Sequence, residues 1–168
     1  MPFEATTILA GGITGMSATL LMDLWNLFLK RAFQIPSLNY CLLGRWLGHM
    51  PLGIFRHLSI AAAAPRPLEC QLGWVAHYSI GISLAVTFVL LAPASWLERP
   101  TVLPALLYGL GTVVFPFFVL QPSLGLGIAS AHTPKPLQAR LKSLGTHAVF
   151  GFALYICALG WQWVGCAA

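Results

Sequence analysis

The stretch GWVAHYSIGISLAVTFVLLAPAS (Gly73–Ser95) decides the fold class of this chain. It contains no Asp, Glu, Lys or Arg, and a helix needs roughly 20 mostly apolar residues to cross a bilayer. Three further apolar stretches, near Ala5–Leu29, Val102–Leu120 and Ser143–Trp163, complete a set of four predicted spans. Barrels need short alternating strands instead, and no such alternation occurs. The sequence therefore predicts an all-α polytopic membrane protein in which residues 1–168 form a single four-helix domain.

The composition excludes an ordinary soluble domain. Hydrophobic residues make up 58% of the 168 residues and charged residues only 8%, against about 25% charged in a typical soluble domain. The first span is interpreted as a retained helix, because MPFEATT contains Glu4 and no basic residue, unlike a signal peptide.

The basic residues predict the orientation of the chain. Of the nine, only Arg99 lies between the second and third spans; the other eight follow the first or third span (Lys30, Arg31, Arg45, Arg56, Arg66, Lys135, Arg140 and Lys142). Basic loops stay in the cytoplasm. We therefore expect a bacterial inner membrane protein with both termini outside the cytoplasm. Orientation accounts for the net charge of +5, so no nucleic-acid partner is indicated.

The long first loop is too apolar for a flexible linker. Its stretch Pro36–Met50 predicts a helix at the membrane interface, with Ser37 as N-cap and Trp46 and Arg45 at the boundary that they favour.

The cysteines suggest no disulfide framework. Cys41 and Cys70 fall on the predicted cytoplasmic side, where thiols usually stay reduced. Cys157 and Cys166 are nine residues apart, roughly 13 Å along a helix, which exceeds the reach of a disulfide. We therefore expect four unpaired cysteines.

Small and polar residues recur four apart within the predicted spans. In the first span this ridge comprises Thr7, Gly11, Gly15, Thr19 and Asp23. His77 precedes Gly81 by four residues, and His147 precedes Gly151 by four residues. Small residues let helices approach closely in lipid, so these ionisable side chains are expected on packing faces. All lie near the cytoplasmic ends of their spans. They predict a polar intramembrane site formed by Asp23, His77 and His147 and supported by Asn26, Tyr78 and Gln121.

Several chemistries fit this set of residues. Asp23 could carry a proton, with the histidines as relays. The candidate metal ligands are Asp23, His77 and His147, and haem b could bind between the two histidines. The alternative is interhelical hydrogen bonding without a ligand. His49, His57 and His132 could form a second, cytoplasmic metal cluster or face solvent and headgroups. No nucleophile elbow, HExxH, CxxC or phosphate loop indicates an enzyme.

The third span carries Pro116 and ends at Pro122. Internal proline bends a helix. Gly125 and Gly127, which follow, are compatible with an ordinary loop after a kinked helix or with a re-entrant loop that lines a cavity.

Five stretches of the sequence are distinctive: MDLWNLFLKR (Met22–Arg31), IPSLNYCLLGRWLGHM (Ile35–Met50), LGWVAHYSIGI (Leu72–Ile82), PFFVLQPSLGLGIASAHTP (Pro116–Pro134) and HAVFGFALY (His147–Tyr155). In these stretches the chain resembles a family of small bacterial membrane proteins known as domain of unknown function 2938. The resemblance implies an intact four-span protein and adds no catalytic residue, cofactor or partner.

The sequence favours binding of a small molecule or ion near the cytoplasmic leaflet, with its transport as the further expectation. The alternatives are a haem- or metal-binding redox subunit and a non-catalytic accessory subunit of a membrane complex. Besides the lipid bilayer, a homodimer or a larger membrane complex is the expected partner, because four spans are few for a monomeric transporter.

Overall fold

The computed structural model describes residues 2–165, and these contain helices but no strand. The α-helices are α1 (Pro2–Phe33), α2 (Tyr40–His49), α3 (Glu69–Leu91), α4 (Val102–Gly111), α5 (Gln121–Ser123) and α6 (Pro136–Gly165). Four stretches are long and apolar enough to cross a membrane, namely Thr6–Phe33, Glu69–Leu91, Val102–Ser123 and Pro136–Trp161. The predicted all-α class and the number of spans are confirmed. The helix that contains the last predicted span, α6, begins at Pro136 and so includes polar residues that precede Ser143.

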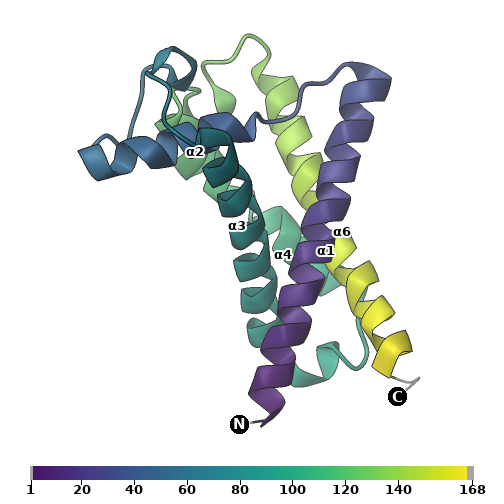
Figure 1. Ribbon diagram of the computed structural model, residues 1–168. Helices are drawn as coiled ribbons and strands as arrows, with labels where there is room; N and C mark the ends of the chain where they lie inside the picture. The colour runs from purple at the N-terminus through teal and green to yellow at the C-terminus, as the bar shows by residue number, and fades with distance from the viewer. Residues whose placement is uncertain (1, 166–168) are drawn as a thin grey trace. The chain divides into compact units, whose positions relative to one another are not determined.

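The chain divides into two compact units. Unit 1 contains the described residues up to Pro36, together with Ser79–Thr112 and the chain from Thr146 onward. Unit 2 contains Ser37–Tyr78 and Val113–Gly145. In unit 1, the beginning of α1 and the end of α6 lie at the same end (Figure 1).

In unit 1, α1 and the second half of α3 lie side by side at a close helix crossing (Figure 1). A Cβ atom added to Gly15 would lie 2.8 Å from the Cα of Ile82, and one added to Gly81 would collide with the Thr19 hydroxyl. Thr19 is fully buried and donates a hydrogen bond to the Gly15 carbonyl over 2.7 Å. The ridges of small residues predicted in these two helices are therefore packing faces.

A second close crossing joins α4 to α6 in unit 1. A Cβ atom on Gly109 would lie 2.5 Å from the Cα of Gly151, and one on Gly151 would lie 2.5 Å from the carbonyl oxygen of Ala105. Around the two crossings, Phe88 and Leu154 belong to a cluster of buried apolar side chains. The glycine that follows each predicted histidine, Gly81 or Gly151, thus lies at a helix contact.

The third span is interrupted, as its proline predicts. The α-helical part ends at Gly111, and the backbone from Pro116 to Leu120 is π-helical. Proline has no N–H to donate to the preceding turn, which favours such a widening. After α5 the chain is irregular, and Gly125 and Gly127 adopt positive φ angles of 89° and 75°.

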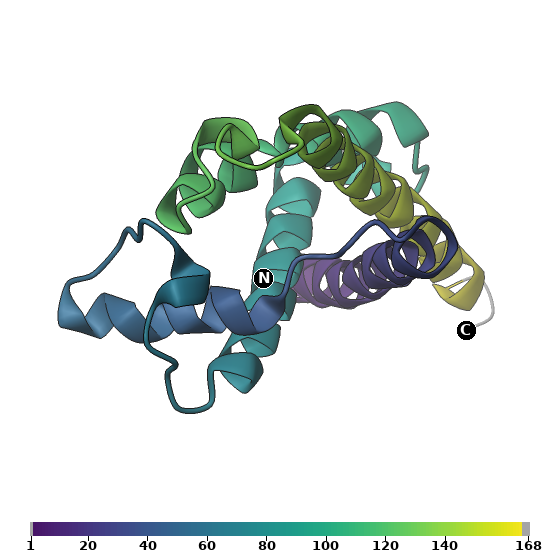
Figure 2. The ribbon, with the colours of Figure 1, turned by 90° about the horizontal axis from the view of Figure 1, so that it is seen from above.

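In unit 2, the interfacial helix predicted over Pro36–Met50 is shorter, and its predicted N-cap is wrong. The helix α2 begins at Tyr40, and Asn39, not Ser37, is the N-cap, because its side-chain oxygen accepts a hydrogen bond from the Cys41 N–H over 3.0 Å. In Figure 2 the chain leaves the end of α2, forms a loop and returns to α2 where α3 begins.

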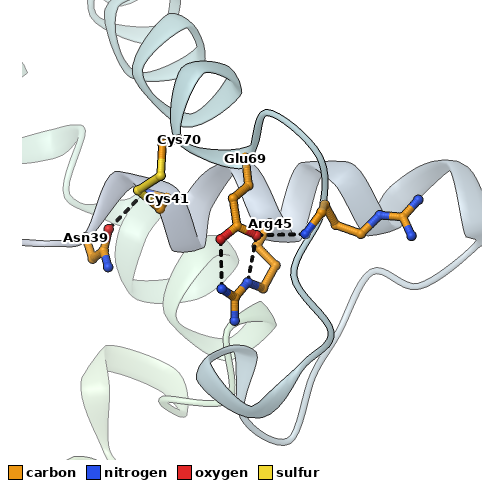
Figure 3. The surroundings of a disulfide bond; sticks show 6 residues. Asn39, Cys41, Arg45, Glu69 and Cys70 are labelled. Carbon is orange, nitrogen blue, oxygen red and sulfur yellow. Dashed lines mark hydrogen bonds and ion pairs between the residues drawn. A yellow bond between two sulfur atoms is a disulfide. The ribbon is translucent and has the colours of Figure 1, made fainter.

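The expectation that Cys41 and Cys70 are unpaired is contradicted. Cys41 lies in the first turn of α2 and Cys70 in the first turn of α3, and the two residues form a disulfide (Figure 3). They are separated by 29 positions in the sequence, and only the return of the loop brings them together. On α6, Cys157 is free, as expected; Cys166 lies outside the described residues.

An ion pair joins the same two helix ends beside the disulfide. Arg45 donates to both carboxylate oxygens of Glu69 over 2.8 and 2.9 Å (Figure 3). The backbone N–H of Arg66 donates to the same carboxylate over 2.9 Å. Gly44 packs so closely on the Glu69 carbonyl that no side chain would fit there. The start of α3 is thereby fixed to α2 at several points.

Candidate functional site

Two of the predicted site residues in unit 1, Asn26 and His147, take part in hydrogen bonds made by one stretch of α6. Thr146 donates a hydrogen bond to Oδ1 of Asn26 over 3.2 Å. His147, the next residue, places Nδ1 2.7 Å from the Thr112 hydroxyl. Asn26 belongs to α1, and Thr112 directly follows α4, so consecutive residues of α6 are bonded to two other spans. These four residues are called here the polar layer of unit 1.

The hydroxyl of Thr112 defines which nitrogen of His147 carries the proton. This hydroxyl donates to the Gly109 carbonyl over 2.6 Å. Since a hydroxyl has one proton, it accepts the hydrogen bond from His147, and we assign the proton to Nδ1. The lone pair on Nε2 is then the one that can accept a proton or bind a cation.

Asp23 lies one helical turn before Asn26 on α1, and its side chain is half-buried. Residues three apart share a helical face. Unit 1 therefore places the predicted carboxylate on the same face of α1 as the Asn26 side chain that bonds α6. This arrangement can supply an acidic group, an amide and an imidazole from two helices.

The other three predicted residues lie in unit 2, where His77 is surrounded by aromatic rings. Its imidazole stacks on Tyr40 with ring centroids 4.1 Å apart. Tyr78 and Trp74 meet the same imidazole edge-on at 5.4 and 6.0 Å. An aromatic enclosure of this kind favours a cation over its ring faces.

Gln121 is the most deeply buried of the predicted residues in unit 2. Its amide nitrogen donates to the Ser143 hydroxyl over 3.3 Å, which links the end of the third span to α6. Its carbonyl oxygen is buried and has no hydrogen-bond partner among the described residues. Buried acceptors are normally paired, so this oxygen is available to a ligand or a water molecule.

Of the two alternatives for the loop histidines His49, His57 and His132, the metal cluster is contradicted. Within residues 2–165, no group of three His, Cys, Asp or Glu side chains is arranged to hold a metal ion. The rings of His49 and His57 lie 5.0 Å apart, but His132 lies against Gly127. The metal and haem hypotheses for Asp23, His77 and His147 join residues of both units and stay predictions.

His57 should make the protein less stable in acid. Burial lowers the pKa of His57, and the neighbouring His49 lowers it further; within the described chain its Nε2 is buried without a partner. The unfolded chain, with a His pKa of about 6.5, then binds more protons than the folded chain below that pH, so stability falls as the pH falls. We expect His57→Gln to reduce the loss of thermal stability of the detergent-purified protein between about pH 7.5 and 5.5. Equal losses in both proteins would contradict this role.

The sequence reasoning missed Thr112, Thr146 and Tyr40. Threonine and tyrosine are not ionisable near neutral pH, so a search for acids and imidazoles passes over them. For Thr112 a signal exists, since it follows Gly109 and Gly111 in a span that is soon interrupted by Pro116. For Tyr40, in the first loop, no signal links it to His77.

Four long apolar helices, with glycine contacts between helices in unit 1, define a multi-pass helical membrane protein. One family model, described as protein of unknown function DUF2938, matches residues 13–160. The chain belongs to this family, which confirms the resemblance. No match was found among curated proteins or among solved structures.

Proposed function

We propose that this protein binds a small cation, in the first place a proton, at a polar intramembrane site and moves it across the bilayer. The observation that carries this function is the polar layer of unit 1. Its hydrogen bonds connect three apolar spans, from the first, third and fourth helices that could cross a membrane. The residues are Asn26, Thr146, His147 and Thr112. Polar side chains at membrane depth are costly and mark ion or substrate paths by default.

The interruption of the third span supports the same function. Thr112 lies where α4 ends, and the π-helical turn begins four residues later. Broken or widened helices are tolerated at membrane depth where they line a cavity or meet neighbouring protein, and π-helical turns are frequent at functional sites. His147 is hydrogen-bonded to Thr112, the C-cap residue at which α4 ends.

The proposed orientation follows from the basic loops. The basic segments Lys30–Arg66 and Lys135–Lys142 face the cytoplasm, and both termini lie outside it, in a bacterial inner membrane. In this orientation Asp23 and His147 lie toward the cytoplasmic ends of their spans. A proton taken from the cytoplasm would meet them first.

The test is proton flux into liposomes that contain the purified protein and an internal pH dye. A potassium diffusion potential drives the flux. Asp23→Asn and His147→Gln should each reduce it to the level of empty liposomes, because each removes a proton-accepting group and keeps the size of the side chain. Both variants should elute from gel filtration like the wild type.

The matched control is His132→Gln, a histidine of the exposed loop after the third span. This variant should retain the wild-type flux. Unchanged flux in Asp23→Asn would exclude the assigned carboxylate. Wild-type liposomes that pass no protons above the empty control would contradict proton transport itself.

A further inference from the structure

We propose that the Cys41–Cys70 disulfide is a reversible thiol–disulfide exchange site that reacts with a dithiol, either a small molecule or a protein. The exchange is separate from the proposed movement of cations. It is based on the exposure of one cysteine, the position of both cysteines at helix N-termini and the contacts that hold the two helices together without the bond.

The two cysteines differ in exposure. Cys70 is exposed, whereas Cys41 is half-buried. Exchange begins when an external thiolate attacks one sulfur along the S–S axis, and access is one of the factors that decide which sulfur reacts. Attack is therefore expected at Cys70, which makes Cys41 the leaving group.

The leaving sulfur lies where a thiolate is stabilised. Cys41 is the second residue of α2, and its N–H is already engaged by the Asn39 side chain in a capped N-terminus (Figure 3). The N-terminal end of a helix favours negative charge and lowers the pKa of cysteine thiols there. A lower thiol pKa makes a better leaving group in exchange.

The two helix ends stay together when the bond opens. The bidentate pair of Arg45 and Glu69 joins them beside the disulfide. Gly44 packs on the Glu69 carbonyl, and Gly73 packs on the carbonyl of Tyr40. Reduction therefore leaves the thiols next to each other, so that the pair can be oxidised again.

The exchange site depends on the orientation proposed above. In the cytoplasm, glutathione and thioredoxin keep thiols reduced, and a disulfide that forms there is usually transient, catalytic or redox-sensing. A permanent structural bond would instead require the first loop to lie outside the cytoplasm. The basic residues of this loop argue for the cytoplasmic side.

The reaction balances as a two-electron exchange. One thiolate of the dithiol bonds to Sγ of Cys70, and the S–S bond breaks, so that Cys41 leaves as a thiolate and takes up a proton. The second thiol of the dithiol loses its proton and attacks the other sulfur of the dithiol, which is bonded to Cys70 in the mixed disulfide. Cys70 leaves as a thiolate and is protonated. The protein gains two electrons and two protons, and the dithiol becomes a disulfide.

The test uses the full chain with Cys157→Ser and Cys166→Ser, so that Cys41 and Cys70 are the remaining cysteines. Samples of growing cells are taken before, during and after exposure to the thiol oxidant diamide, and each sample is quenched in acid. Free thiols are then counted with a mass-tagged maleimide. We expect the dithiol before, the disulfide during, and the dithiol again after recovery. Dithiothreitol should also reduce the bond in native membranes.

A second measurement compares the accessibility of the two thiols, on which the expected attack at Cys70 is based. In the same background, Cys41→Ser leaves Cys70 alone and Cys70→Ser leaves Cys41 alone. The single Cys70 should react with glutathione disulfide on the order of tenfold faster than the single Cys41 in native membranes. Equal rates, or a faster Cys41, would contradict attack at Cys70.

Two outcomes of the cell experiment would overturn the exchange site. A bond that is complete at all three times and resists dithiothreitol in native membranes is structural. If Cys41 and Cys70 stay reduced during exposure to diamide, they do not form the disulfide in cells. A membrane-impermeant maleimide applied to whole cells of the single-Cys70 variant tests the proposed orientation of the first loop. Cys70 reacts with this reagent only if the loop lies outside the cytoplasm. Proton flux is measured separately, so its loss or retention does not decide the exchange.

Discussion

Replacing Gly109 with alanine should destabilise the protein by about 3 kcal/mol, at the upper end of the usual cost of overpacking. The added methyl group would lie 2.5 Å from both the N and the Cα of Gly151 and 2.7 Å from the carbonyl oxygen of His147. These are backbone atoms in a helix, so they cannot move away as a flexible side chain could. The two helices would have to separate, and the packing around Leu154 would loosen with them. Thermal unfolding of the detergent-purified variant should show the loss.

The same substitution two residues later is the matched control. Nothing lies within 4 Å of a Cβ atom on Gly111, and alanine is favoured over glycine in a helix by about 1 kcal/mol. Gly111→Ala should therefore be neutral or slightly stabilising. A Gly109→Ala variant as stable as Gly111→Ala would contradict the close crossing of α4 and α6.

Replacing Arg45 with leucine should destabilise the protein by about 1–3 kcal/mol, the cost of leaving a partly buried polar group without its hydrogen-bond partner. The two side chains are only 13% and 14% exposed. The variant would leave the Glu69 carboxylate with the hydrogen bond from the Arg66 N–H. The same guanidinium also donates to three loop carbonyls, those of Ile60, Ala61 and Ala63. We expect a lower unfolding temperature and faster proteolysis of the loop between α2 and α3.

A double variant separates the charge effect from lost packing. Replacing both members of a buried pair with apolar residues is often neutral, because no unpaired charge remains. Arg45→Leu with Glu69→Met should therefore regain much of the stability lost in Arg45→Leu. If the double variant is no more stable than the single one, the loss comes from the loop carbonyls and not from the ion pair.

The spans and their packing faces were predictable because they depend on local patterns. Uninterrupted apolar length defines a span wherever it occurs, and residues four apart share a face in any helix. Gly15, Gly81 and Gly151 therefore lie at the helix contacts where their spacing places them. The interruption at Pro116 was predictable for the same reason, since proline removes a hydrogen bond in every helix.

The features that depend on the path of the first loop were not predictable. Cys41 meets Cys70, and Tyr40 meets His77, because the loop returns to α2, and no periodicity records that return. The rule that cytoplasmic thiols usually stay reduced favoured unpaired cysteines, whereas Cys41 and Cys70 form a disulfide in the structure. For the candidate site, the sequence identified Asn26 and His147 but missed Thr112, the hydroxyl that His147 contacts. The convergence of Asp23, His77 and His147 stays a prediction.

The π-helical turn at Pro116–Leu120 has a consequence for the residues that follow it. Such a turn accommodates one more residue than α-helical winding would, and each residue of an α-helix advances the winding by about 100°. Gln121 therefore points in a direction that a regular helix of the same length would not give it. Its hydrogen bond to Ser143 relies on that angular offset. Shortening the turn by one amino acid would rotate the amide away from α6 while leaving the length of the span almost unchanged.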